Sequence, residues 1–244
     1  MSSAYDEIAD LYDRNWKDWY LPEALPALQK LFFDVVPAGA RVLDVCCGSG
    51  HVTRELIARG YRVTGIDESE QLVRLAKAKL REGQFVVQDV RALGLRPVFD
   101  AAISTFDALN HLLTTADLRA SFEAVRGALK PGAPFVFDLN GQAAYRIDTT
   151  RWQPTVDTDS VSLVRGTYDP VTKVGATELV WFRRRGGELW ARHASTVRER
   201  SYEPHEVLEL LAEAGFRRVE PTPAGAAGAY GEIELGRTFF SAWA

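Results

Sequence analysis

The chain has 244 residues, 29 of them basic and 33 acidic, which gives a formal net charge of -4. This length suits one α/β domain with an insertion and leaves too little chain for two independent domains. No long basic block is present, which argues against a polyanion-binding surface and so against a nucleic-acid partner. The polar and acidic N-terminus and the lack of a long apolar run predict a soluble protein that does not enter a membrane.

The only cysteines are Cys46 and Cys47, which are adjacent. They provide no disulfide framework, so a reducing cytoplasm is the expected compartment. They are either reactive thiols or small residues that pack between a strand and a helix, and we favour the second interpretation.

Two helices are predicted before the first strand. Ile8, Leu11 and Tyr12 fall on one helical face, which predicts a helix docked by its apolar stripe. Residues 22–36 are predicted to form a second amphipathic helix, which has Val35 on its apolar side and ends at Pro37-Ala38-Gly39.

A strand, a glycine turn, a helix and a second strand follow between residues 41 and 67. The glycines at 48 and 50 let the backbone approach a ligand closely, and the helix that begins there offers unpaired N–H groups. Asp67 ends the second strand about 20 residues further on, where it can accept hydrogen bonds from both ribose hydroxyls. These features predict a cofactor that contains a nucleoside.

Departures from the dinucleotide fingerprint narrow the choice of cofactor. That fingerprint has glycine where this chain has Cys46 and Thr53, and Asp44 would lie close to an anionic pyrophosphate. Both features disfavour NAD. A cofactor with adenosine, no phosphate and a cationic amino-acid end suits Asp44 better, because the carboxylate attracts an ammonium group.

The segment Leu43-Asp44-Val45-Cys46-Cys47-Gly48-Ser49-Gly50 resembles motif I of the class I S-adenosylmethionine-dependent methyltransferases. Cys46 stands where that family most often has its first glycine. The pattern is most similar to small-molecule members, including those that act on amino sugars. The resemblance implies S-adenosyl-L-methionine as cofactor and a small-molecule substrate whose nitrogen or oxygen nucleophile is methylated in line, mainly by positioning.

The resemblance also implies a lid, because a Tyr-Asp-x-x-Ala-x-x-Tyr-Asp segment like residues 5–13 closes over the site in related methyltransferases. Aromatic faces there would suit a sulfonium cation. A lid and a docked helix are compatible interpretations. The cofactor contacts that we predict lie in this segment and at the strand ends: Tyr12, Trp19, Asp44, Cys46, Cys47, Gly48, Gly50, Asp67, Glu68, Asp89, Val90, Thr105 and Phe106.

The next elements predicted are a helix at 69–80, strands at 85–87 and 99–104, a helix at 116–129 and a strand at 135–140. Asp89 and Val90 follow the third strand, where a carboxylate can accept from the adenine amino group and an apolar residue can contact the ring. Asp89 could instead cap the next turn.

The loop after the fourth strand lies below the transferring methyl group in the family that the chain resembles. We therefore predict substrate contacts for Asp107, Asn110 and His111. His111 is a candidate general base, although a histidine hydrogen-bonded to the backbone is the alternative. A metal-assisted variant would place Mg²⁺ among Asp107, Asp138 and Asn140, but such residues more often serve as caps and turn formers, and we predict no metal.

Residues 141–201 break the α/β rhythm. Alternating patterns at 162–168, 177–184 and 189–200, joined by turns, predict an inserted antiparallel sheet. We favour a cap that covers the substrate over a decoration or an oligomer surface. His193 lies in this insertion and is the second candidate catalytic residue.

A helix over residues 202–214 and strands at 216–220 and 237–243 complete the chain, with a mobile loop at 221–236. The fold class predicted is α/β, a Rossmann-like seven-stranded methyltransferase sheet with an antiparallel β subdomain inserted after the fifth strand. Residues 1–140 and 202–244 form the cofactor-binding domain, with a helical lid at 1–36, and residues 141–201 form the cap. We expect a monomer or homodimer.

The sequence is also compatible with two other functions. One is an NAD-dependent oxidoreductase, which Cys46, Thr53 and Asp44 disfavour. The other is a catalytically silent cofactor-binding protein that presents the inserted sheet to a protein partner.

Overall fold

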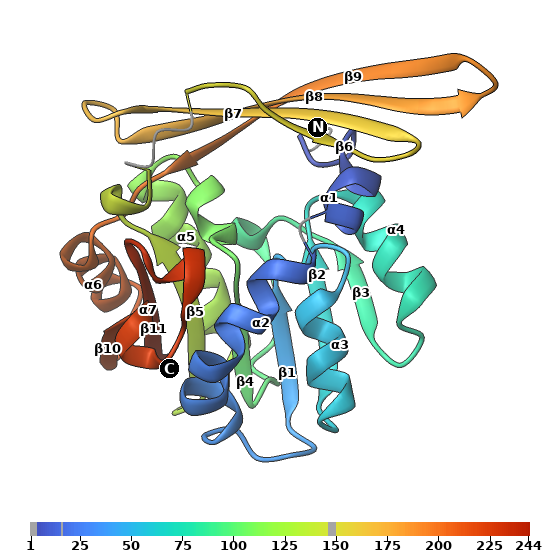
Figure 1. Cartoon of the computed structure of the whole chain (residues 1–244). Coiled ribbons are helices and arrows are strands. Elements are labelled where there is room, and N and C mark those ends of the chain that lie inside the picture. Colours follow the sequence, from blue (N-terminus) through green and yellow to red (C-terminus); the bar gives the residue numbers. More distant parts are fainter. Residues whose placement is uncertain (1–3, 16, 146–149) are drawn as a thin grey trace.

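The protein contains two sheets joined by a continuous chain (Figure 1). The computed structural model describes residues 4–15, 17–145 and 150–244, and side chains 15 and 17–19 lie outside this description. The main sheet has seven strands in the order β10-β11-β5-β4-β1-β2-β3. Its strands are β1 (Arg41–Val45), β2 (Arg62–Asp67), β3 (Gln84–Val87), β4 (Ala101–Ser104), β5 (Pro134–Asn140), β10 (Arg218–Pro223) and β11 (Arg237–Trp243).

Strands β1 to β5 run parallel, whereas β11 pairs antiparallel with both β5 and β10. The central strands β1, β4 and β5 are short apolar runs buried on both faces, as a parallel sheet covered by helices requires. The predicted Rossmann-like sheet with an antiparallel insertion after the fifth strand is therefore confirmed.

Helices cover both faces of this sheet. Apolar residues of α5 (Thr115–Ala128) and α6 (Pro204–Glu213) pack on one face. Those of α2 (Lys17–Leu28), α3 (His51–Ala58) and α7 (Ala224–Ala227) pack on the other. Helix α4 (Glu70–Lys79) packs on β3, and its N-cap Ser69 accepts a hydrogen bond from the Leu72 N–H at 3.1 Å.

Short helical turns complete the main body. They are the π-helical turn Gln29–Phe33 and the 3₁₀ turns Val90–Ala92, Ala108–His111, Gln142–Tyr145 and Gly231–Glu234.

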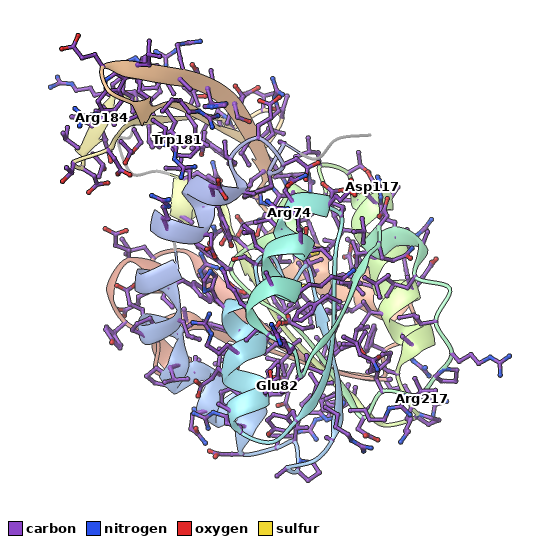
Figure 2. All side chains as sticks on the ribbon, turned by 90° about the vertical axis from the view of Figure 1, so that its right-hand side faces the viewer. Arg74, Glu82, Asp117, Trp181, Arg184 and Arg217 are labelled. Carbon is purple, nitrogen blue, oxygen red and sulfur yellow. The ribbon has the colours of Figure 1, made fainter. Side chains whose placement is uncertain are left out.

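The second sheet lies over the carboxyl ends of the parallel strands, with α1 (Ala9–Asn15) beneath it (Figure 1). It consists of β6 (Gln153–Val156), β7 (Ser160–Asp169), β8 (Val174–Gly186) and β9 (Leu189–Arg200), all antiparallel. Three of these strands match predicted segments, and β6 was not predicted. Figure 2 shows Trp181 and Arg184 on this sheet, above the main body.

The predicted second helix is wrong in its start and in one apolar position. Helix α2 begins at Lys17, so Pro22 and Pro26 lie inside it, and Val35 is exposed. Proline removes a backbone donor from a helix. Burial of Ala24, Ala27 and Leu28 in the core compensates, because tertiary packing outweighs local propensity.

The predicted loop at 221–236 is also wrong. Strand β10 continues to Pro223, α7 follows, and a 3₁₀ turn ends at Glu234. Ala224, Ala227 and Ile233 are buried against α2, so small apolar residues that suggested a loop are core residues here.

Within the described residues, no helix combines the length and the apolar character that crossing a bilayer requires.

Candidate active site

The backbone after β1 forms a tight turn in which Cys46, Gly48 and Gly50 have φ values of 57°, 53° and 86°. The Gly48 N–H donates to Asp67 Oδ2 at 2.9 Å, and the Ser69 N–H donates to Asp67 Oδ1 at the same distance. Asp67 therefore ties the end of β2 to the glycine turn. Burial raises the pKa of its carboxyl to about 6.

Asp44 lies at the core side of this turn and is almost fully buried. Its Oδ2 accepts a hydrogen bond of 2.5 Å from Thr53 Oγ1. Burial raises the pKa of Asp44 to about 7, although the Thr53 hydroxyl opposes this shift. A small cavity of about 40 Å³ lies between α2 and the turn. Asp44, Cys46, Cys47 and their neighbours line it.

Both cysteines behave as packing residues. Cys47 is buried with residues of α4 and β3, and Cys46 is half-buried. Burial raises the pKa of both thiols, which disfavours the reactive thiolate.

A larger cavity of about 330 Å³, which we call the turn cavity, opens at the carboxyl ends of β1, β2, β3 and β4. It gathers residues from separate predicted motifs, as parallel strands that end at one edge should. The predicted cofactor residues that line it are Tyr12, Cys46, Gly48, Asp67, Glu68, Asp89, Val90, Thr105 and Phe106.

Asp89 lines the turn cavity. It also takes the role that the sequence allowed as an alternative, which is to cap the next turn. Its side chain caps the turn Val90–Ala92 by accepting from the Arg91 N–H at 2.9 Å, and it also pairs with the Arg91 guanidinium at 2.6 Å. This pair lowers the pKa of Asp89. Val90 is buried and forms an apolar wall.

The sheet cavity, about 230 Å³, lies between α1 and the inserted sheet. Four side chains line both it and the turn cavity: Tyr5, Tyr12, Phe106 and His111. Its other walls are Ile8, Asp107, Thr177, Leu179, Val197 and Glu199. The inserted sheet therefore closes the sheet cavity with residues of β8 and β9.

The loop between the two cavities is held in a strained conformation. Phe106 and Asp107 have φ values of 65° and 49°, which non-glycine residues rarely adopt. The buried Arg237 pairs with Asp107 at 3.1 Å and with Asp138, and it lies over the Tyr20 ring. Burial lowers the pKa of Arg237, but the two carboxylates outweigh it, so the pKa is raised and the residue stays charged.

This ion pair bears on the metal alternative. Asp107 and Asp138, two of the three suggested Mg²⁺ ligands, are bound to Arg237, and Asn140 Nδ2 donates to Asp107 Oδ2 at 3.0 Å. Within residues 4–15, 17–145 and 150–244, no group of three or more His, Cys, Asp or Glu side chains could hold a metal ion.

His111 sits between the cavities with both ring nitrogens engaged. Nδ1 lies 3.0 Å from the Arg198 carbonyl oxygen, which can only accept, so Nδ1 carries the proton. Nε2 then accepts from the Tyr5 hydroxyl at 3.0 Å. The ring is therefore both hydrogen-bonded to backbone and exposed to the cavities through Nε2.

The predicted site residues Gly50, Asn110 and His193 line none of the three cavities. Asn110 is fully buried, and its amide bonds to the backbone of Asn140 and Arg200 at 2.7 to 3.0 Å, so both of its N–H donors are used. His193 is six residues before Glu199 on β9, about 20 Å away at about 3.3 Å per residue, and it lines none of the three cavities. Trp19 belongs to α2, but its side chain lies outside the described part of the structure.

Several residues of the site were missed from sequence. Tyr5 is visible only as part of the Tyr-Asp segment, and nothing in the local sequence marks Arg237. Glu199 does stand at an inward position of the alternating pattern in β9, together with the buried Val197. This alternation of inward and outward positions was the one sequence signal that could have identified Glu199.

Polar contacts fasten α1 over the glycine turn. Asp13 Oδ1 accepts from Ser49 Oγ at 2.7 Å, from His51 Nε2 at 3.1 Å and from Lys79 Nζ. On the opposite side, Asp10 pairs with Arg183 of β8 at 3.0 Å. Helix α1 is thus tied both to the main body and to the inserted sheet.

Comparison with known proteins adds independent findings. The chain matches a family model described as a methyltransferase domain over residues 42–132. It is 30% identical over 229 residues to the ubiquinone biosynthesis O-methyltransferase of Xylella fastidiosa (strain 9a5c), which covers 84% of this chain and 88% of that protein.

Two solved structures share its fold. One is an S-adenosylmethionine-dependent methyltransferase from Clostridium acetobutylicum ATCC 824, with a TM-score of 0.80, 19% identity and 99% of both chains covered. The other is a sugar N-methyltransferase from Streptoalloteichus sp ATCC 53650, with a TM-score of 0.77, 19% identity, and 100% of this chain and 95% of that chain covered.

The glycine turn and the acidic end of β2 thus occur in a chain that is similar to a known methyltransferase over most of its length. By that similarity and by its fold, the chain belongs to the class I S-adenosylmethionine-dependent methyltransferases.

Proposed function

We propose that this enzyme transfers the methyl group of S-adenosylmethionine to a nitrogen or oxygen atom of a small molecule in the sheet cavity. The observation that supports this most strongly is the wall shared by the two cavities, formed by Tyr5, Tyr12, Phe106 and His111. A cofactor in the turn cavity would meet an acceptor in the sheet cavity across these side chains.

The turn cavity has the donor set that the cofactor needs. A Cβ added to Gly48 would stand 3.6 Å from the Tyr12 ring, so glycine keeps the space beside the turn open. Each Asp67 oxygen accepts one backbone N–H and keeps a lone pair for a ribose hydroxyl. Val90 would contact the adenine ring, and Asp44 would attract the ammonium group of the amino-acid end.

When bound, S-adenosylmethionine supplies an electrophilic methyl group on a sulfonium sulfur. The contribution of the chain would be to align the acceptor with that group and to exclude water. Phe106 stacks on Tyr20 at 4.6 Å and lies 6.2 Å from Tyr12, so aromatic faces border the reacting region. Such faces stabilise a cation.

We also propose that residues 1–36 form a lid and that residues 141–201 form a cap, on the methyltransferase domain of residues 1–140 and 202–244. Tyr5 and Tyr12 border both cavities, so the N-terminal segment would have to move when ligands enter. Asp13→Ala removes the contacts to Ser49, His51 and Lys79. The variant should release bound S-adenosylhomocysteine faster in stopped-flow measurements, and an unchanged release rate would contradict the lid.

A base is needed only if the acceptor arrives protonated. His111 is the residue that we propose for this role, because Nε2 is the unprotonated ring nitrogen and could take a proton once the Tyr5 hydroxyl has turned away. His111→Ala should lower turnover without a change in cofactor affinity.

Methyl transfer itself is tested by incubating the protein with methyl-labelled S-adenosylmethionine and a panel of small amines and alcohols. Label in an acceptor would support the proposal. Cofactor binding without transfer to any acceptor would favour the silent binding protein, whereas the family assignment argues against the NAD-dependent oxidoreductase.

A further inference from the structure

Glu199 brings a carboxylate into the sheet cavity without a strong cationic partner. Its side chain is only 19% exposed. Oε2 accepts a hydrogen bond from the Tyr145 hydroxyl at 2.8 Å, and Oε1 lies 3.7 Å from His111 Nε2, beyond hydrogen-bond distance. Among the described residues, no Lys or Arg forms an ion pair with it. The Oε1 oxygen of Glu199 can therefore still accept hydrogen bonds from a ligand in the sheet cavity.

The other carboxylate of the cavity is already neutralised. Asp107 pairs with Arg237 at 3.1 Å and accepts from Asn140 Nδ2 at 3.0 Å. Arg237 is shared with Asp138, however, so one guanidinium faces two carboxylates before Glu199 is considered. With Asp107, Asp138 and Glu199 ionised and His111 neutral, this group of side chains carries a net negative charge.

An ionised carboxylate in such a place calls for a cation. Burial, followed by the nearby Asp107 charge, raises the pKa of Glu199, and these two effects outweigh the His111, Tyr145 and Arg237 side chains, which lower it. Ile8, Leu179 and Val197 form an apolar part of the wall, and the uncharged Thr177 compensates no charge. A ligand that carries a positive group next to an apolar body would satisfy both kinds of wall.

We propose that Glu199 selects an amine as the methyl acceptor, which enters the sheet cavity as an ammonium ion and is methylated on nitrogen. This inference rests on the proposed function, since it assumes that the acceptor occupies this cavity. It narrows the reaction from a nitrogen or oxygen nucleophile to nitrogen. An alcohol brings no positive charge and would leave the Glu199 carboxylate without a partner.

Residues that line the two cavities can take up the proton that this reaction releases. The ammonium group gives one proton to His111 Nε2, after the Tyr5 hydroxyl has turned away from that atom. The freed nitrogen lone pair forms the new C–N bond as the S–C bond breaks, and its electron pair stays on sulfur, giving S-adenosylhomocysteine. Glu199, 3.7 Å from Nε2, stabilises the imidazolium that forms.

A purely structural role for Glu199 is the competing explanation. Tyr145 donates to it, stacks on Tyr168 at 5.3 Å and fills the space beside Gly175. Glu199→Gln separates the two roles, because the amide oxygen still accepts from Tyr145 while the charge is lost. Glu188→Gln is the matched control, an exposed glutamate at the turn between β8 and β9.

The test measures binding of matched probes to the protein saturated with S-adenosylhomocysteine. The probes are cyclohexylamine against cyclohexanol and benzylamine against benzyl alcohol, at pH 7.5. Each amine should bind at least about tenfold more tightly than its alcohol in the wild type and in Glu188→Gln, and about equally to it in Glu199→Gln. Affinity for S-adenosylhomocysteine should be the same in all three proteins.

The outcomes are distinct. If S-adenosylhomocysteine binds but the amines bind no better than the alcohols, or not at all, the amine proposal is wrong and the proposed function stands. Retention of the amine preference in Glu199→Gln would also overturn it. If the wild type does not bind S-adenosylhomocysteine, the proposed function fails and the inference fails with it.

Discussion

The backbone N–H of Gly48 donates to Asp67 Oδ2 at 2.9 Å, so two residues 19 positions apart form one structural unit. This bond joins the turn after β1 to the end of β2, at the edge where parallel strands line the cavity. The spacing between glycine and acid therefore has a second physical meaning, because Asp67 shapes the turn as well as facing the turn cavity.

Asp67→Ala tests this double role. The variant loses the acceptor for two backbone N–H groups and, in our account, for the ribose hydroxyls. Affinity for S-adenosylhomocysteine should fall by about 1–3 kcal/mol, the range for losing a buried acceptor. Titration calorimetry measures it, with Glu82→Ala, an exposed site on the main body (Figure 2), as control. Unchanged affinity in a folded variant would remove Asp67 from the cofactor site.

Gly50→Ala and Gly60→Ala separate backbone strain from steric conflict. Both glycines have nearly the same φ, 86° and 85°, so alanine pays a similar left-handed penalty of about 1–2 kcal/mol at each. The added Cβ at 50 would lie 2.7 Å from Leu80 Cδ1, whereas nothing lies within 4 Å at 60. Urea unfolding should show the larger loss of stability for Gly50→Ala, and equal losses would mean that Leu80 yields freely.

Asp44 should couple cofactor binding to proton release. Its pKa of about 7 is above its ordinary value, so the free protein holds a proton there below pH 7. The ammonium end of the cofactor favours the carboxylate, so binding should release this proton and weaken as pH falls from 7 to 5. Calorimetry in buffers of different ionisation enthalpy at pH 6.5 and 8 measures the release.

The expected release is larger at pH 6.5 than at 8. Asp67, with a pKa of about 6, contributes a smaller share at pH 6.5. Asp44→Asn should therefore reduce the release without abolishing it. A variant that releases as many protons as the wild type would show that Asp44 does not sense the ligand.

Arg237→Met should destabilise the fold by about 3–5 kcal/mol, because it leaves the buried Asp138 and its neighbour Asp107 without their cation. Burial already raises the pKa of Asp138, so its ionised form becomes costly above that pKa. The loss should shrink as pH falls from 8 to 5 and the carboxyl takes up a proton. Urea unfolding at both pH values measures it.

The matched control is Arg218→Met, which breaks an exposed pair with Glu220 on β10. Both of its side chains are more than half exposed, at 65% and 51%. Its loss should be within about 1 kcal/mol and hardly change with pH. Equal losses for the two variants would mean that the Arg237 pair contributes no more than a surface pair.

The glycine turn and the strands of the main sheet could be predicted because their signals are local. Apolar runs mark β1, β4 and β5, and the spacing from Gly48 to Asp67 reports one hydrogen bond. The same locality explains the errors. Residues 224–233 contain alanines and glycines that are typical of loops, and only the neighbouring α2 makes them core.

The acceptor side could not be predicted for the opposite reason. Arg237 reaches Asp107 across 130 positions of sequence, and Tyr5 reaches His111 across 106. Asn110 was expected to contact substrate, but its buried amide fastens the loop to β5 and β9 instead. Such contacts depend on how segments far apart in the sequence pack against one another, which no local pattern records.

The most direct test of the account is parallel titration calorimetry of the purified protein with S-adenosylhomocysteine, S-adenosylmethionine and NAD. We predict binding of the first two with a Kd of about micromolar or tighter and no binding of NAD. Binding of NAD alone would contradict the assignment of the turn cavity, and binding of none of the three would contradict the central claim that this glycine turn holds a cofactor.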